Sequence, residues 1–110
     1  MLRAEMQDSA KGLVVRLAGR FAGDDAEYVR MLVTRCNIER GLVVDLTDVT
    51  FIDSVGEATL SFFSRLKAKF VANDVYVLGV CQQLHLPLAR NGKWKEAAPQ
   101  VRDSRPANDS

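Results

Sequence analysis

The sequence predicts an α/β domain in which helices pack on a mixed β-sheet of about four to five strands. Short apolar runs of strand length, at residues 13–17, 42–46 and 75–80, are separated by longer stretches whose apolar residues recur at three- and four-residue steps. The resulting order is strand, strand, helix, strand, helix, strand, helix. Residues 1–102 are expected to form one domain, and the polar residues 103–110 a disordered tail.

The N-terminal part of the chain predicts a hairpin and then a helix. Residues 2–6 alternate apolar and charged side chains, as an edge strand does, and a turn joins them to the strand at residues 13–17, which Gly19 ends. Asp24 or Asp25 can cap the helix, because Asp24 has capping-box spacing to the glutamate three residues on. One apolar stripe of this helix can pack on a sheet: Ala26, Val29, Leu32 or Val33, and Cys36.

The middle of the chain predicts the central strand and the longest helix. Residues 42–46 are almost wholly apolar, as in a strand covered on at least one face, and a turn is expected at Thr47 and Asp48. A helix is expected from Ser54 towards Phe70, with its apolar side chains on one side. Residues 75–80 are expected to form a further strand, and residues 82–89 a short helix that Pro87 interrupts.

Composition argues against several classes of function. Fifteen basic and fourteen acidic residues leave a formal charge of +1, which gives no sign of a nucleic-acid-binding surface. No apolar run approaches the roughly 20 residues of a membrane span. Residues 1–12 lack the apolar core of a secretory signal, so no such signal is expected. Cys36 and Cys81 do not have CxxC spacing, so both are expected to be reduced core thiols of a cytoplasmic protein.

Enzymatic and metal-binding readings have little support in the sequence. His85 is the only histidine, and a Ser-His-Asp triad would need it to meet Ser54. It stands among leucines, so we expect a partly buried helix residue. Cys81 and His85 have a possible metal spacing, but with Cys36 they give at most three ligands. We therefore expect no enzyme, no metal and no cofactor.

Ser54 is the residue at which function is expected. It is predicted to begin a helix next to the C-terminal end of a strand, and in open α/β sheets ligands and partners usually bind at that edge. One interpretation is structural: the hydroxyl caps the helix, and Glu57 completes an S-x-x-E capping box. The other is phosphorylation, because a helix N-terminus favours an added anion. The two interpretations are compatible.

Residues 45–60, DLTDVTFIDSVGEATL, resemble the signature of the STAS family, which includes the anti-sigma factor antagonists. The family pattern runs roughly D-L-x-x-V-x-F-x-D-S-x-G, and a weaker resemblance extends over residues 13–101. The resemblance implies the STAS-like fold, a mixed sheet with helices packed on it. The positions that match the pattern are Asp45, Leu46, Val49, Phe51, Asp53, Ser54 and Gly56.

The resemblance also implies a mechanism. In the family the serine after the aspartate is phosphorylated, which assigns that role to Ser54. The unmodified protein binds a serine-kinase anti-sigma factor, and phosphorylation by that kinase ends the binding. The expected partner-binding residues are Asp53, which would shape the site, Ser54, Val55, Gly56, which would let a partner backbone approach, and Glu57. Val55 stands where the family usually has Ser or Thr, and Glu57 where it often has an apolar residue.

A second role remains open from the resemblance. STAS modules also serve as regulatory parts of anion transporters, lipid-transport complexes and stress-sensing assemblies, and this chain could be an unphosphorylated subunit of such a complex. In either role we expect a protein partner, no nucleic acid and no membrane insertion, with the chain a monomer or a weak dimer.

Overall fold

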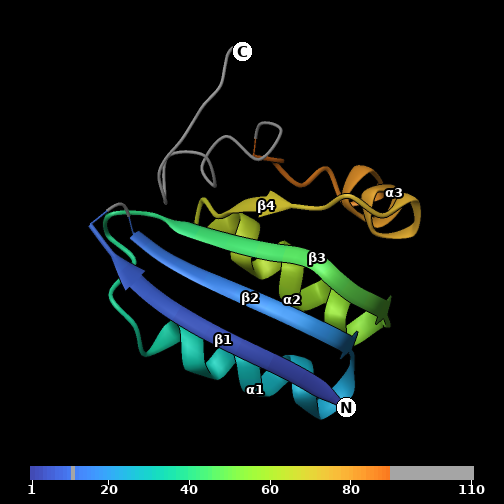
Figure 1. Ribbon diagram of the computed structural model, residues 1–110, viewed down its shortest axis with the longest axis horizontal. Coiled ribbons are helices and arrows are strands. Elements are labelled where there is room, and N and C mark those ends of the chain that lie inside the picture. The colour runs from blue at the N-terminus through green and yellow to red at the C-terminus, as the bar shows by residue number, and fades with distance from the viewer. Residues whose placement is uncertain (11, 90–110) are drawn as a thin grey trace.

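A computed structural model of the chain describes residues 1–10 and 12–89. Its four strands form one sheet in the order β1-β2-β3-β4, in which β1 is antiparallel to β2, while β2, β3 and β4 are parallel. Helices α1 and α2 lie against one face of this sheet, and α3 follows β4 (Figure 1). The predicted α/β class and mixed sheet are therefore confirmed. The elements are β1 Leu2–Ser9, β2 Gly12–Phe21, α1 Gly23–Thr34, β3 Leu42–Ile52, α2 Ser54–Arg65, β4 Lys69–Val71 and α3 Val75–Gln83.

The core lies between the sheet and helices α1 and α2, and the buried residues of α3 extend it. Alternate residues of β2 face it, and Val44 of the central strand β3 is fully buried, as the apolar run predicts. Helix α1 contributes most of the predicted stripe: Ala26, Val29 and Val33 are buried, and Leu32 is only partly buried. Cys36, expected on the same stripe, lies beyond the end of the helix at Thr34 and packs against the core from there. The fully buried side chains of largest volume are Phe21, Phe63, Phe70, Leu46 and Leu60.

Bulges lengthen β3 relative to β2. Arg16 pairs with Asp45, but Ala18 pairs with Asp48, so β3 has one residue more than β2 between these two pairs. A second irregularity follows Gly19, which lies within β2 and does not end it as predicted. Extra residues of this kind bend a strand and increase its twist without ending the pairing.

The predicted turn at Thr47 and Asp48 is wrong, because these residues lie in the first bulge of a continuous strand. Both the N–H and the hydroxyl of Thr47 donate to Oδ1 of Asp45, at 3.0 and 2.6 Å. Asp and Thr form such local bonds to the backbone in turns, and here the same chemistry stabilises an irregular strand. The Thr47-Asp48 pair thus marks an irregular backbone, but because β3 stays paired with β2 here, the irregularity is a bulge and not a turn.

Helix α1 begins without a side-chain cap. Its N-cap is Ala22, which makes no side-chain hydrogen bond, and Asp24 and Asp25 lie inside the first turn. The predicted capping by either aspartate is therefore wrong. Their charges still lie near the positive end of the helix dipole, where carboxylates are favourable.

The second half of the chain departs most from the prediction. Helix α2 ends at Arg65, and Phe70 lies in β4, so the predicted helix is too long. The break falls at Lys67, whose φ of 68° is left-handed and incompatible with a continuing helix.

The strand predicted at residues 75–80 is wrong, because this segment is helix α3. The carboxylate of Asp74 caps it by accepting from the N–H groups of Tyr76 and Val77. Val77, Val80 and Cys81 are buried at helical spacing. The run of β-branched residues favoured a strand, but the cap and this spacing outweigh that preference.

Three further expectations concern His85, the two cysteines and the C-terminal tail. His85 does not lie in a helix; it is exposed, with a left-handed φ of 57°, just after α3. The two cysteines are free thiols, Cys81 buried and Cys36 partly buried. The tail expected at residues 103–110 lies outside the described residues.

Candidate functional site

The site is built where two parallel strands end side by side. β2 ends at Phe21 and β3 at Ile52, and these two residues pair with each other. Helices α1 and α2 begin just beyond them, so the two helix N-termini meet at one edge of the sheet. This is the edge at which open α/β sheets usually bind partners.

One carboxylate joins the two helix N-termini. Oδ1 of Asp53 accepts from the N–H of Gly56, in the first turn of α2, at 2.8 Å. Oδ2 accepts from the N–H of Gly23, the first residue of α1, at 3.1 Å. Asp53 is therefore both the N-cap of α2 and a link between two loops that are 30 residues apart in sequence.

The prediction that Ser54 caps α2 is wrong. Asp53 takes that role, and Ser54 is the first residue of the helix itself. The S-x-x-E capping box with Glu57 is absent, because the N–H of Glu57 donates to the backbone oxygen of Asp53 at 2.8 Å. Asp and Ser are about equally good N-caps, so the sequence could not decide which of these two adjacent residues caps the helix.

Because Asp53 caps the helix, the Ser54 side chain has no capping role. Ser54 is exposed, and its hydroxyl makes no hydrogen bond to any other residue that the structure describes. It lies at the N-terminus of α2, where the helix dipole and N–H groups without helical partners favour a negative charge.

Gly56 is buried within the protein. A Cβ added there would overlap the carbonyl oxygen of Phe21 and lie 2.9 Å from Cγ2 of Ile52. The backbone that approaches Gly56 thus belongs to the end of β2. Its small size lets α2 begin directly against the two strand ends.

The five residues expected to contact a partner divide into two groups. Ser54 is exposed, and Val55 and Glu57 are partly exposed on the first turn of α2. Asp53 and Gly56 are committed to internal contacts. The structure thus brings three of the five to the surface and uses the other two to hold them in place.

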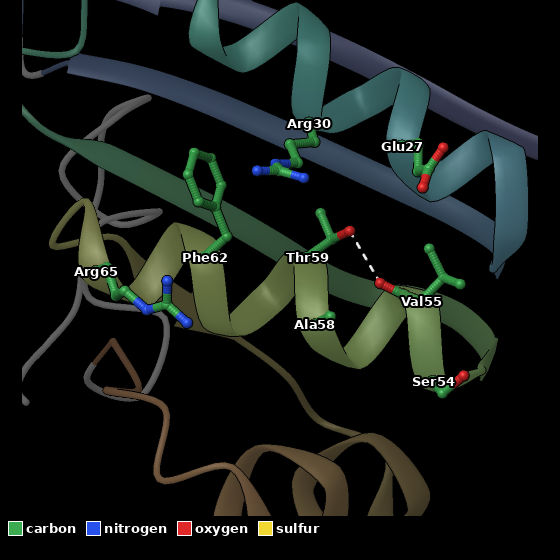
Figure 2. Close-up of a pocket in the computed structure, with 8 residues that line it drawn as sticks. All are labelled: Glu27, Arg30, Ser54, Val55, Ala58, Thr59, Phe62 and Arg65. Carbon is green, nitrogen blue, oxygen red and sulfur yellow. Dashed lines mark hydrogen bonds between the residues drawn. The ribbon is translucent and has the colours of Figure 1, made fainter.

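A groove runs between α1 and α2 and ends at Ser54 (Figure 2). Its volume is about 400 Å³. Arg30 of α1 extends across it, with its guanidinium 4.5 Å from the centre of the Phe62 ring of α2. Thr59 lies below and donates its hydroxyl to the carbonyl of Val55 at 2.9 Å. The sequence carries no signal for this groove, because it depends on how two separate helices pack.

Aromatic side chains stand on the other side of the same edge. The Tyr76 hydroxyl donates to the carbonyl of Ile52 at 3.2 Å and accepts from the N–H of Ile52 at 3.1 Å. It thereby holds α3 against the end of β3. Arg20 stacks on Phe51, 4.4 Å from the ring centre, and both aromatic rings are partly accessible. The contact of Tyr76 with Ile52 was not predicted, because the segment of Tyr76 was expected to be a strand and not a helix.

Within residues 1–10 and 12–89, no three His, Cys, Asp or Glu side chains come together as metal ligands would. Burial raises the pKa of the Cys81 thiol to about 11, so it stays protonated and a poor nucleophile near neutral pH. None of the helices in this part of the chain has the length and apolar character needed to cross a membrane.

Comparison with known proteins agrees with this architecture. The anti-sigma factor antagonist SpoIIAA, in its unphosphorylated form, has a similar structure, with a TM-score of 0.64 and 15% identity over 86% of this chain and 94% of SpoIIAA. An uncharacterized Shewanella loihica protein with a SpoIIAA-like fold matches at a TM-score of 0.49 and 11% identity, over 74% of this chain and 75% of that one. No curated protein matches in sequence. The STAS domain model matches residues 2–78, and the chain therefore belongs to the STAS family.

Proposed function

We propose that the protein is an anti-sigma factor antagonist that binds a serine-kinase anti-sigma factor through the first turn of α2 and is released when Ser54 is phosphorylated. The observation that carries the proposal is the exposed Ser54 hydroxyl, which makes no hydrogen bond to another residue within 1–10 and 12–89 and stands at a helix N-terminus. Val55 and Glu57 complete the contact surface, while Asp53 and Gly56 fix its geometry.

Electrostatics explains how such a switch would work without unfolding the helix. A phosphate adds about −1.5 to −2 charge at neutral pH, and the N-terminus of α2 stabilises an anion. The cap of α2 is made by Asp53, so phosphorylation of Ser54 breaks no side-chain hydrogen bond among the residues that the structure describes. Asp53 and Glu57 already make this turn acidic, and the phosphate makes it strongly so. A partner suited to the unmodified surface would then be repelled.

The similarity to SpoIIAA supports the same role. That protein is an anti-sigma factor antagonist described in its unphosphorylated form, and its fold covers most of this chain. A cytoplasmic location would follow from this role, because sigma factors act on transcription in that compartment.

The test uses three forms of the full chain as bait in extracts of the host cell: wild type, Ser54→Ala and Ser54→Asp. Wild type and Ser54→Ala should retain the same kinase, and Ser54→Asp should lose it. Thr50→Asp is the matched control, because it places the same charge on an exposed residue of β3 four positions earlier. It should bind like wild type.

The retained kinase is then incubated with the wild-type protein and ATP, and intact mass is measured. One phosphate should be added, and Ser54→Ala should add none. Phosphate on Thr47, Thr50 or Thr59 would move the switch away from Ser54. Retention of a transporter or a stress-signalling assembly, with Ser54 unmodified and Ser54→Asp still bound, would favour the alternative role.

A further inference from the structure

The outer edge of β1 is suited to pairing with the same strand of a second copy of the chain. Within the described residues, β1 is an end strand of the sheet and has β2 on one side only. It is eight residues long and regular, pairing with β2 without a bulge. An end strand of this length presents a row of backbone N–H and C=O groups that can pair with another strand.

The two faces of β1 differ sharply. Leu2, Ala4 and Met6 are partly buried and pack at the margin of the core. Arg3 and Glu5 alternate with them on the opposite face and are exposed. A strand added to this edge must therefore place apolar side chains on one face of the sheet. On the other face it must place charges complementary to Arg3 and Glu5.

A second copy of β1 meets both demands in one antiparallel register. When Ala4 lies opposite Ala4 of the second copy, Leu2 lies opposite Met6, and Arg3 lies opposite Glu5. The apolar faces then coincide, and the two-fold axis creates two Arg–Glu pairs. Directly opposed side chains on one face lie about 4.5–5.5 Å apart, so such pairs interact.

Neighbouring registers fail for definite reasons. A shift by one residue places the apolar face of one copy against the charged face of the other. A shift by two residues in one direction puts Arg3 opposite Arg3, and in the other direction Glu5 opposite Glu5. Like charges directly opposed destabilise a strand pair.

Helix α1 adds apolar surface at the same margin. It lies beneath β1 and β2, at the edge of the molecule (Figure 1). Arg30 of α1 faces α2, and the helical pitch places Tyr28 about 200° further round, on the side away from α2. Tyr28 is 56% exposed. A second copy paired through β1 would bring a second α1 towards this side.

We propose that two copies of this chain associate through β1 in this register, joining their four-stranded sheets into one continuous sheet. Five residue pairs of β1 form the centre of the contact. Because the contact is small, the dimer is weak and concentration-dependent. This inference does not depend on the role of Ser54.

Charge reversal tests the register directly by sedimentation equilibrium at concentrations up to about 1 mM. Wild type should dimerise. Arg3→Glu and Glu5→Arg each replace both ion pairs by like charges and should weaken the dimer by about tenfold or more. The double variant restores both pairs with exchanged signs and should dimerise like wild type. An equimolar mixture of the two single variants should form the mixed dimer, in which every pair is complementary.

Asp8→Lys is the control, because it changes charge on the same strand outside the paired residues, and dimerisation should persist. Circular dichroism verifies that each variant is folded. A wild-type protein that stays monomeric at all concentrations, or a double variant that does not recover, would overturn the proposal.

A cross-linking experiment tests the same register by comparing rates of disulfide formation, not dimer affinities. Ala4→Cys places two thiols opposite each other across the two-fold axis, whereas Glu5→Cys places its thiol opposite Arg3. In a Cys36→Ser background, mild oxidation should link Ala4→Cys faster than Glu5→Cys. Equal or reversed rates would refute the register.

Discussion

Replacing Asp53 by alanine should destabilise the protein much more than replacing Ser54. Asp53→Ala removes the cap of α2, which is worth about 0.5–2 kcal/mol. It also removes the bond from the N–H of Gly23, and a hydrogen bond to a charged group is worth about 1.5–3 kcal/mol. The carboxylate is only partly buried, so we expect a combined loss of about 2–4 kcal/mol in the free energy of unfolding.

Ser54→Ala should cost less than about 0.5 kcal/mol, because the hydroxyl is exposed and makes no bond to a described residue. Asp53→Asn is the intermediate case, since its amide has only one acceptor oxygen for the two donors. Urea unfolding at neutral pH measures all three. If Ser54→Ala proves as costly as Asp53→Ala, the serine is the cap and the assignment of the two residues is wrong.

Three further changes probe contacts next to the site and in the core. Gly56→Ala should cost about 1–3 kcal/mol or more in urea unfolding, since its methyl group overlaps the carbonyl oxygen of Phe21; stability equal to wild type would contradict the close approach. Tyr76→Phe removes both hydrogen bonds to Ile52 and should cost about 1–3 kcal/mol, with faster amide exchange at Ile52; unchanged exchange would show that this contact does not hold α3. Burial raises the pKa of Cys81 from 9.0 to about 11, so the folded state holds this proton more tightly than the unfolded state. The stability linked to this thiol is therefore fully present below about pH 9 and should fall, by up to about 2–3 kcal/mol, as pH rises through 11. Cys81→Ala should lose this part of the pH dependence and keep the part that comes from other titrating groups.

The fold was predictable from the sequence where a local pattern agreed with the tertiary environment. The alternation of β1, the apolar run around Val44 and the stripe of α1 each lie on the face that the sheet buries. The segment around Tyr76 was not predictable in the same way, because its β-branched residues favour a strand. A short helix there depends on the cap from Asp74 and on burial supplied by the rest of the fold.

The sequence predicted Ser54 as the cap of α2, whereas the structure gives this role to the adjacent Asp53. Spacing alone could not decide whether Asp53 or Ser54 capped α2, since either side chain suits the position. The deciding contact is the bond to Gly23, which exists only after β2 and β3 lie side by side. The groove that contains Arg30 and Phe62 depends on the same assembly.

The bond between Asp53 and Gly23 also has a consequence for when the site comes into being. Closing a loop of 30 residues costs chain entropy that no local contact repays, so this bond forms only with the parallel pairing of the central strands. A chain emerging from the ribosome, or one partly unfolded, would display Ser54 on an unanchored segment. Any kinase that requires the anchored first turn of α2 would therefore act only on molecules that have finished folding.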